Sequence, residues 1–132
     1  MEELNLSFLQ KSIELPKKEE DLHPKGWGYE NWIVNNELYC GKVLFFEAGK
    51  RCSWHYHKIK DETFYIQSGS IMVTYGNSDD INESRTVTLN KGDKFYVYPG
   101  LRHQMQAIID TELIEFSTQH FEDDSYRIIK GD

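Results

Sequence analysis

Residues 53–63, SWHYHKIKDET, place two histidines one residue apart, with a glutamate five positions after the second. In a β-strand alternate side chains face the same way, so His55 and His57 share one face while Trp54 and Tyr56 point to the other. After the short turn KIK, Glu62 begins the next strand and can face the same interior. An isolated His-x-His pair is most often an ordinary hydrogen-bonded or exposed pair. Whether these side chains form a metal site therefore depends on the rest of the chain.

The residues from Trp27 onward form short runs rich in β-branched and aromatic residues, separated by Gly, Asn, Asp or Pro. Such runs are typical of strands joined by turns. No convincing long helix separates them, which favours a sandwich or barrel. The runs are YCGKVLFF, CSWHYH, TFYIQ, IMVTY, RTVTL, KFYVY, QMQAII and ELIEFS. The predicted fold class is all-β, and a length of 132 residues fits one domain.

The first 25 residues differ in composition from the rest of the chain. They are charged and are interrupted by Pro16 and Pro24, so we expect residues 1–25 to form an extended N-terminal arm. A short helix over residues 4–9 is only weakly indicated. Residues 26–132 are expected to form the β-barrel, with an acidic loop near the C-terminus.

The composition argues against several classes of partner. The net charge of −7 and the scattered Lys and Arg argue against nucleic acid, because phosphate contacts need clustered basic residues. The N-terminus lacks a basic leader, and no run approaches the ~20 apolar residues that a membrane span needs. We therefore expect a cytoplasmic protein without membrane contact. Cys40 and Cys52 are too few for a disulfide scaffold and are expected to be reduced, buried thiols.

A third histidine follows a Pro-Gly corner in YPGLRH, residues 98–103. This corner would return the chain across the barrel and bring His103 to the two strand histidines and Glu62. Imidazole nitrogens with a carboxylate suit Zn, Mn, Fe, Co or Ni and leave coordination positions open for a substrate. Buried polar groups of this kind would be costly without a partner. The sequence therefore predicts one divalent metal ion, and His23 and His120 are expected at the surface.

The spacing of these residues resembles the two-part pattern of the cupin superfamily. The chain departs from that pattern at Tyr98, where a proline is usual, and at Ala107, where an asparagine often follows. Over residues 41–117 the resemblance implies a cupin double-stranded β-helix, a small jelly-roll barrel that is often dimeric, and we expect a homodimer. It implies His55, His57, Glu62 and His103 as metal ligands. The matching positions are Gly49, His55-x-His57, Glu62, Gly69, Gly92-Asp93, Pro99-Gly100 and His103.

Further stretches are similar to cupin sugar isomerases, namely the type II phosphomannose isomerases and the D-lyxose isomerases. They are WGYENWIV, CGKVLFF, SWHYHKIKDE and IEFSTQHFEDDSYR. The first group usually has glutamine where this chain has His55, and the second group is typically much longer. The resemblance implies that Glu115 moves the proton and that Lys60 steadies the developing oxyanion. We expect the substrate to be bound by Lys42, Asp123, Asp124 and Arg127.

Each of these residues has an alternative role. Lys60 could be a solvated turn lysine, and Lys42 could be an edge-strand lysine. Glu115 could be exposed, because the sequence does not fix which face of its strand looks inward. The acidic loop and Arg127 could form a solvated tail with weak surface ion pairs. The aromatic residues of WGYENW are better explained as core than as a sugar platform.

These features favour a metal-dependent aldose–ketose isomerase for a small sugar or sugar phosphate, of the mannose 6-phosphate or D-lyxose type. Two alternatives remain open. A His/His/Glu set with open positions can also bind Fe(II) and O₂, as in an oxygenase, although Lys60 has no evident use there. The third hypothesis is a non-catalytic sugar-binding or regulatory cupin, in which a metal is structural or orients a ligand.

Overall fold

The computed structural model describes residues 20–132, and the elements in this part of the chain are strands apart from one 3₁₀ turn. The prediction of an all-β fold is confirmed. Residues 1–19, with most of the expected arm and the weakly indicated helix, lie outside the described residues. The elements are β1 (Leu22–Lys25), β2 (Gly28–Asn35), β3 (Cys40–Phe46), β4 (Trp54–Tyr56), β5 (Glu62–Ser68), β6 (Ser70–Gly76), η1 (Ile81–Glu83), β7 (Arg85–Asn90), β8 (Lys94–Val97), β9 (Arg102–Ala107), β10 (Thr111–Ser117) and β11 (Tyr126–Ile129).

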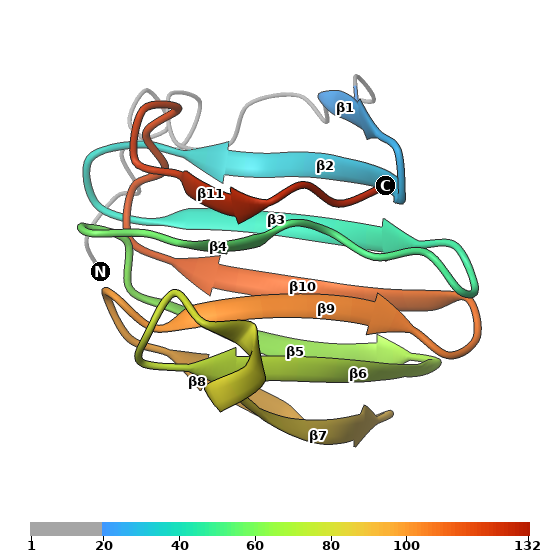
Figure 1. The fold of residues 1–132 in the computed structure, drawn as a ribbon. Helices are drawn as coiled ribbons and strands as arrows, with labels where there is room; N and C mark the ends of the chain where they lie inside the picture. Colours follow the sequence, from blue (N-terminus) through green and yellow to red (C-terminus); the bar gives the residue numbers. More distant parts are fainter. Residues whose placement is uncertain (1–19) are drawn as a thin grey trace, which may run out of the picture.

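The strands form two antiparallel sheets that share one core (Figure 1). The first sheet has six strands in the order β1-β2-β3-β10-β5-β8, and the second has five in the order β11-β4-β9-β6-β7. Neighbours such as β3 and β10 are far apart in the sequence, so much of the fold depends on non-local pairing. The end of the expected arm joins the first sheet, because β1 pairs with β2.

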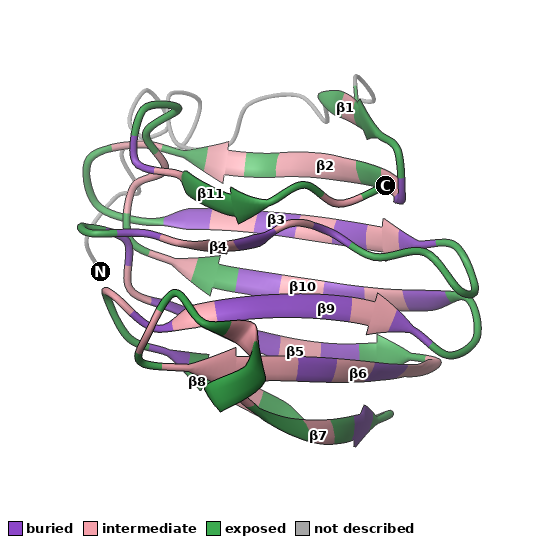
Figure 2. Cartoon of the chain, viewed as in Figure 1, coloured by how far each residue is buried: buried purple, intermediate pink, exposed green. Residues whose placement is uncertain are grey.

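Buried and more exposed residues alternate along β3 and along most of β10 (Figure 2). On β3 the side chains of Cys40, Lys42, Leu44 and Phe46 are buried, whereas the residues between them are partly exposed. This period of two is the expected pattern for a strand with one face on a core. It also places a lysine among the buried residues, so Lys42 is not the edge-strand lysine considered above: β3 lies between β2 and β10.

The inward positions are polar toward one end of the central strands and mostly apolar toward the other. In the register of β3 with β10, Lys42 lies opposite Glu115, and two residues further Leu44 lies opposite Leu113. Strands β5 and β9 begin with polar inward residues and continue with apolar ones; they contribute Glu62, Phe64 and Ile66, and His103, Met105 and Ala107. The strand register therefore gathers the candidate site residues at one end of the core.

The turns carry the glycines of the sequence pattern. Gly69 joins β5 to β6 with a φ of 96°, a conformation that side chains with a Cβ rarely adopt. A Cβ at this position would come within 2.4 Å of the backbone oxygen of Asp110, so only glycine fits the turn as built. Within residues 20–132 no helix is long and apolar enough to cross a membrane.

Candidate metal centre

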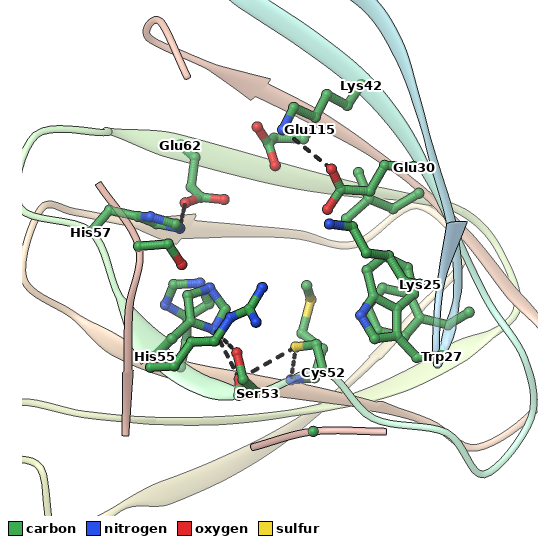
Figure 3. Close-up of a pocket in the computed structure, with 18 of the residues that line it drawn as sticks. Lys25, Trp27, Glu30, Lys42, Cys52, Ser53, His55, His57, Glu62 and Glu115 are labelled. Carbon is green, nitrogen blue, oxygen red and sulfur yellow. Dashed lines mark hydrogen bonds and ion pairs between the residues drawn. The ribbon is translucent and has the colours of Figure 1, made fainter. Parts of the chain in front are cut away.

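A cavity of about 360 Å³ lies between the two sheets and takes in the polar end of the barrel (Figure 3). Its volume falls in the range of small-molecule sites. The lining includes the three histidines of the sequence pattern, several acids and several bases, together with apolar side chains such as Leu44 and Phe46. A cavity that combines charged groups of both signs with an apolar floor suits a polar ligand of small size.

The structure brings together three of the four predicted metal ligands. His55 on β4 pairs directly with His103 on β9, and His57 follows β4 by one residue. One ligand nitrogen from each ring lies within 4.8 Å of the other two. The ring centroids of His55 and His103 are 4.4 Å apart, and those of His55 and His57 are 5.0 Å apart. The cluster could therefore hold one metal ion between its rings.

Each imidazole is oriented by a backbone carbonyl. The Nδ1 atom of His55 lies 2.8 Å from the carbonyl oxygen of Ser53, that of His57 lies 2.7 Å from Asp124, and that of His103 lies 3.0 Å from Leu101. A carbonyl only accepts, so each Nδ1 carries the proton and donates it, which leaves the Nε2 lone pair free.

The three rings are neutral. Burial lowers the pKa of His55 to about 3, of His57 to about 2 and of His103 to about 4. Neutral imidazoles with free Nε2 lone pairs are the form that a metal ion requires.

The buried carboxylate of Glu62, the fourth predicted metal ligand, also indicates that a cation binds here. Its carboxylate is buried, and its Oε2 atom has no hydrogen-bond partner in the described part of the chain. This oxygen lies 3.3 Å from Nε2 of His57, so two acceptors face each other. Burial raises the pKa of Glu62, and the nearby Lys60 only partly opposes this effect. A proton or a metal ion between the two atoms would relieve the contact, and the donor set of three imidazoles and one carboxylate fits a divalent metal.

Lys60 and Glu115 form a buried ion pair beside the histidine cluster. The Nζ atom of Lys60 donates to Oε2 of Glu115 at 3.3 Å and lies 4.0 Å from Oε2 of Glu62. Burial opposes the charge on Lys60, but the carboxylates of Glu115 and Glu62 outweigh it and raise the lysine's pKa. Ser117 donates a second hydrogen bond to the same Glu115 oxygen at 3.0 Å. Neither the solvated lysine nor the exposed glutamate considered above describes these residues, since both are at most 5% exposed.

A second lysine–glutamate pair lines the same cavity. Lys42, which is 1% exposed, donates to Oε1 of Glu30 at 3.4 Å and lies 4.2 Å above the ring of Trp32. The indole of Trp32 donates to that same oxygen at 2.8 Å. The pKa of Glu30 is lowered: burial works against this shift, and Lys42 and Trp32 overcome it. The Lys42–Glu30 pair therefore adds two charged groups to the cavity wall.

One expectation about the periphery was wrong. His120 is not a surface residue: its side chain is 13% exposed, lines the cavity and places Nδ1 3.2 Å from Nζ of Lys60. Burial, together with Lys42 and Lys60, lowers its pKa to about 4, so the ring is neutral and accepts from the lysine. His23 is one-third exposed and stacks on Trp32 at 3.9 Å.

Of the three acids in the acidic loop, Glu122 lines the cavity, whereas Asp123 and Asp124 do not. Asp123 is exposed, and Asp124 is buried with its carboxylate turned to the backbone of residues 58–60; neither lines the cavity. A substrate-binding role for either residue therefore stays a prediction, and Asp124, being buried, is not part of a solvated tail. Arg127 does line the cavity, from β11 beside His55.

Glu30 and His120 are cavity residues that the sequence reasoning did not single out. A signal for Glu30 existed, because it shares strand parity with Trp32 within WGYENW. No local signal marks His120, which reaches the cavity from a loop. Trp27, expected in the core, is 7% exposed and stacks on Phe46 at 4.0 Å, so it serves both the core and the cavity wall.

Comparison with solved structures shows the same fold in several proteins. The capsular polysaccharide assembling protein CapF from Staphylococcus aureus superposes with a TM-score of 0.75 at 17% identity, over 84% of this chain and 33% of CapF. Oxalate decarboxylase from Bacillus subtilis gives 0.72 at 21% identity, over 82% of this chain and 30% of the enzyme. KdgF from a Halomonas species gives 0.66 at 18% identity, over 78% of this chain and 89% of KdgF. The chain thus spans about a third of the first two proteins. No curated protein matches the sequence.

Fold and site together define a small β-barrel whose interior carries a histidine cluster able to hold a metal ion. Residues 42–116, more than half of the chain, match the family model described as Cupin domain. The chain belongs to the cupin family, which confirms the superfamily expected from the spacing of its glycines and histidines. The resemblance to sugar isomerases within that superfamily stays a prediction.

Proposed function

We propose that this cupin is a metal-dependent aldose–ketose isomerase that acts on a small sugar or sugar phosphate. The observation that carries the proposal is the buried Lys60–Glu115 pair in the cavity that also holds the three histidines. An isomerase of this kind must polarise a carbonyl, remove a proton from the neighbouring carbon and return it to the other carbon. Each requirement has a candidate group within this one cavity.

Glu115 is the proton carrier in this mechanism. Its Oε2 atom is held by Lys60 and Ser117, which fixes the carboxylate while it takes a proton from one carbon and returns it to the next. Lys60 can then donate to the oxygen on which negative charge develops. A divalent metal held by His55, His57, His103 and Glu62 would polarise the carbonyl as a Lewis acid.

The second charged pair and the basic lining give the substrate its other contacts. Lys42 and Glu30 offer a donor and an acceptor for sugar hydroxyls, and Arg127 offers a planar donor suited to a hydroxyl pair or a phosphate. The named role of CapF in capsular polysaccharide assembly, and that of oxalate decarboxylase as an enzyme for a small oxygen-rich molecule, support polar substrates in this fold. Both likenesses concern the fold alone.

The test is turnover by the metal-loaded protein on a panel of aldoses that includes D-lyxose, D-mannose and mannose 6-phosphate. We expect ketose formation, and we expect Glu115→Gln to lose at least about 10²-fold in kcat while metal and sugar binding persist. Glu112→Gln is the matched control, because Glu112 lies on the same strand with the opposite parity and outside the cavity. Its activity should equal that of the wild type.

Other outcomes point to the other hypotheses. Ketose formation that is unchanged in Glu115→Gln would contradict the role of this residue. Sugar binding without turnover, with metal content confirmed, would instead support a binding cupin. Oxygen consumption by the Fe(II) form with an aromatic or thiol substrate would support an oxygenase.

A further inference from the structure

The turn that follows His57 converges on a single buried carboxylate. Residues 57–61 connect β4 to β5, and three consecutive backbone N–H groups in this turn point at Asp124, which lies more than 60 positions later. The N–H of Lys58 donates to Oδ1 at 2.8 Å, and that of Lys60 donates to Oδ2 at 3.0 Å. The N–H of Ile59 lies between them, 3.1 Å and 3.2 Å from the two oxygens.

Asp124 is only 3% exposed, so its carboxylate is removed from water and depends on these three donors. Hydrogen bonds from backbone N–H groups to a buried carboxylate are charge-assisted and stronger than neutral ones. Successive N–H groups that point at one anion also form a concave nest, which holds a turn in one conformation. The carboxylate therefore fixes the turn that carries Lys60.

The backbone of the same residue reaches the metal cluster. The Nδ1 atom of His57 donates to the carbonyl oxygen of Asp124 at 2.7 Å. That bond selects the ring tautomer whose Nε2 lone pair faces Glu62 and the other two histidines. Asp124 thus contacts both sides of the site: its carbonyl orients a predicted metal ligand, and its carboxylate holds the turn from which Lys60 reaches Glu115.

We propose that Asp124 is a positioning residue that locks His57 and Lys60 into one arrangement, rather than a substrate ligand. Within the described residues it does not line the cavity, and its two carboxylate oxygens are engaged by the turn. Groups that orient metal ligands typically change metal affinity or activity by 10–100-fold when they are altered. The inference rests on the proposed metal-dependent activity, and its tests include readouts that need no turnover.

The first test compares Asp124→Asn with Asp80→Asn. Both changes remove one charge from an aspartate that accepts a backbone N–H, but Asp80 is exposed and caps η1, whereas Asp124 binds the turn that carries Lys60. Titration of each folded variant with Zn²⁺ should show about tenfold weaker binding for Asp124→Asn and no change for Asp80→Asn. In sugar turnover, kcat should fall with little change in KM. Unchanged metal affinity with a raised KM would overturn the proposal and make Asp124 a substrate contact.

The second test uses the unmodified chain and covers the case in which Asp124→Asn fails to fold. In the metal-free protein, nitrogen NMR of His57 should show the Nδ1–H tautomer, and the amides of Lys58, Ile59 and Lys60 should resist hydrogen exchange. A His57 ring protonated at Nε2 instead, or turn amides that exchange as fast as those of the exposed Glu37–Tyr39 segment, would overturn the proposal. Neither measurement depends on isomerase activity, so failure of the proposed function would be seen separately.

Discussion

Removal of the Lys60 charge should expose how much the fold depends on the buried ion pair. Lys60→Met keeps most of the side-chain volume but leaves Glu115 without its cation at a site where both side chains are at most 5% exposed. Breaking a buried pair by removing one partner costs about 3–5 kcal/mol, because the remaining charge is desolvated and uncompensated. With an m-value of about 2 kcal/mol/M in urea, a loss of 3 kcal/mol lowers the unfolding midpoint by about 1.5 M.

The assay is urea unfolding of metal-free protein at neutral pH, followed by tryptophan fluorescence. Lys58→Met is the control, because Lys58 is exposed on the same turn, and its midpoint should move by less than about 0.5 M. The double variant Lys60→Met/Glu115→Gln removes both charges. Its free energy of unfolding should exceed that of Lys60→Met alone by more than about 1 kcal/mol. If the effects of the two single changes simply add within about 0.5 kcal/mol, the two side chains are not coupled and the reasoning is refuted.

Two further predictions concern protons and metal at the histidine cluster. In the metal-free protein His55, His57 and His103 have folded pKa values of about 3, 2 and 4 against 6.5 for the free side chain, so the stability that they contribute is present above pH 6.5 and lost as the pH falls. His120, with a folded pKa of about 4, adds a fourth such proton, and Glu62, whose pKa is raised, offsets about one of the four. The net loss of stability between pH 6 and pH 5 should be about 3–4 kcal/mol by urea unfolding, and a flat profile over this range would contradict neutral buried rings. Addition of Zn²⁺ at 100 times its Kd should stabilise the fold by about 2.7 kcal/mol and raise Tm by roughly 10 °C, as measured by calorimetry. His103→Ala should abolish most of this shift, and a shift that persists in the variant would place the metal elsewhere.

Much of the fold could be predicted because its signals are local. The alternation of CGKVLFF shows directly in the burial of β3, and the turn glycines interrupt the runs where the strands end. The convergence of His55, His57 and His103 also followed from strand parity and one Pro-Gly corner. Parity is a property of neighbouring residues, so a single sequence contains it.

The remaining features depend on contacts between distant residues and therefore leave no local trace. Lys60 lies in a turn, where lysine side chains are usually solvated. It is buried here because Glu115 and His120, from other parts of the chain, contact its Nζ atom. In the sequence Asp124 is one of several acids in a charged loop, yet its carboxylate accepts hydrogen bonds from the backbone of the turn after His57. Whether Glu115 points inward depends on the register of β10 between β3 and β5, which one strand alone does not specify.

The core and the candidate site share the same strand register, and this ties function to folding. On β10 the parity that buries Leu113 also turns Glu115 into the cavity, and on β3 the parity that buries Leu44 also turns Lys42 inward. A slip of one residue in either strand would send these side chains to the outer face and bring Ile114 or Val43 inward instead. The apolar half of each strand resists that slip, because Leu44 and Leu113 would leave the positions that they fill and side chains of another shape would have to pack there. The apolar core thereby stabilises the inward placement of charged residues, which would otherwise favour water.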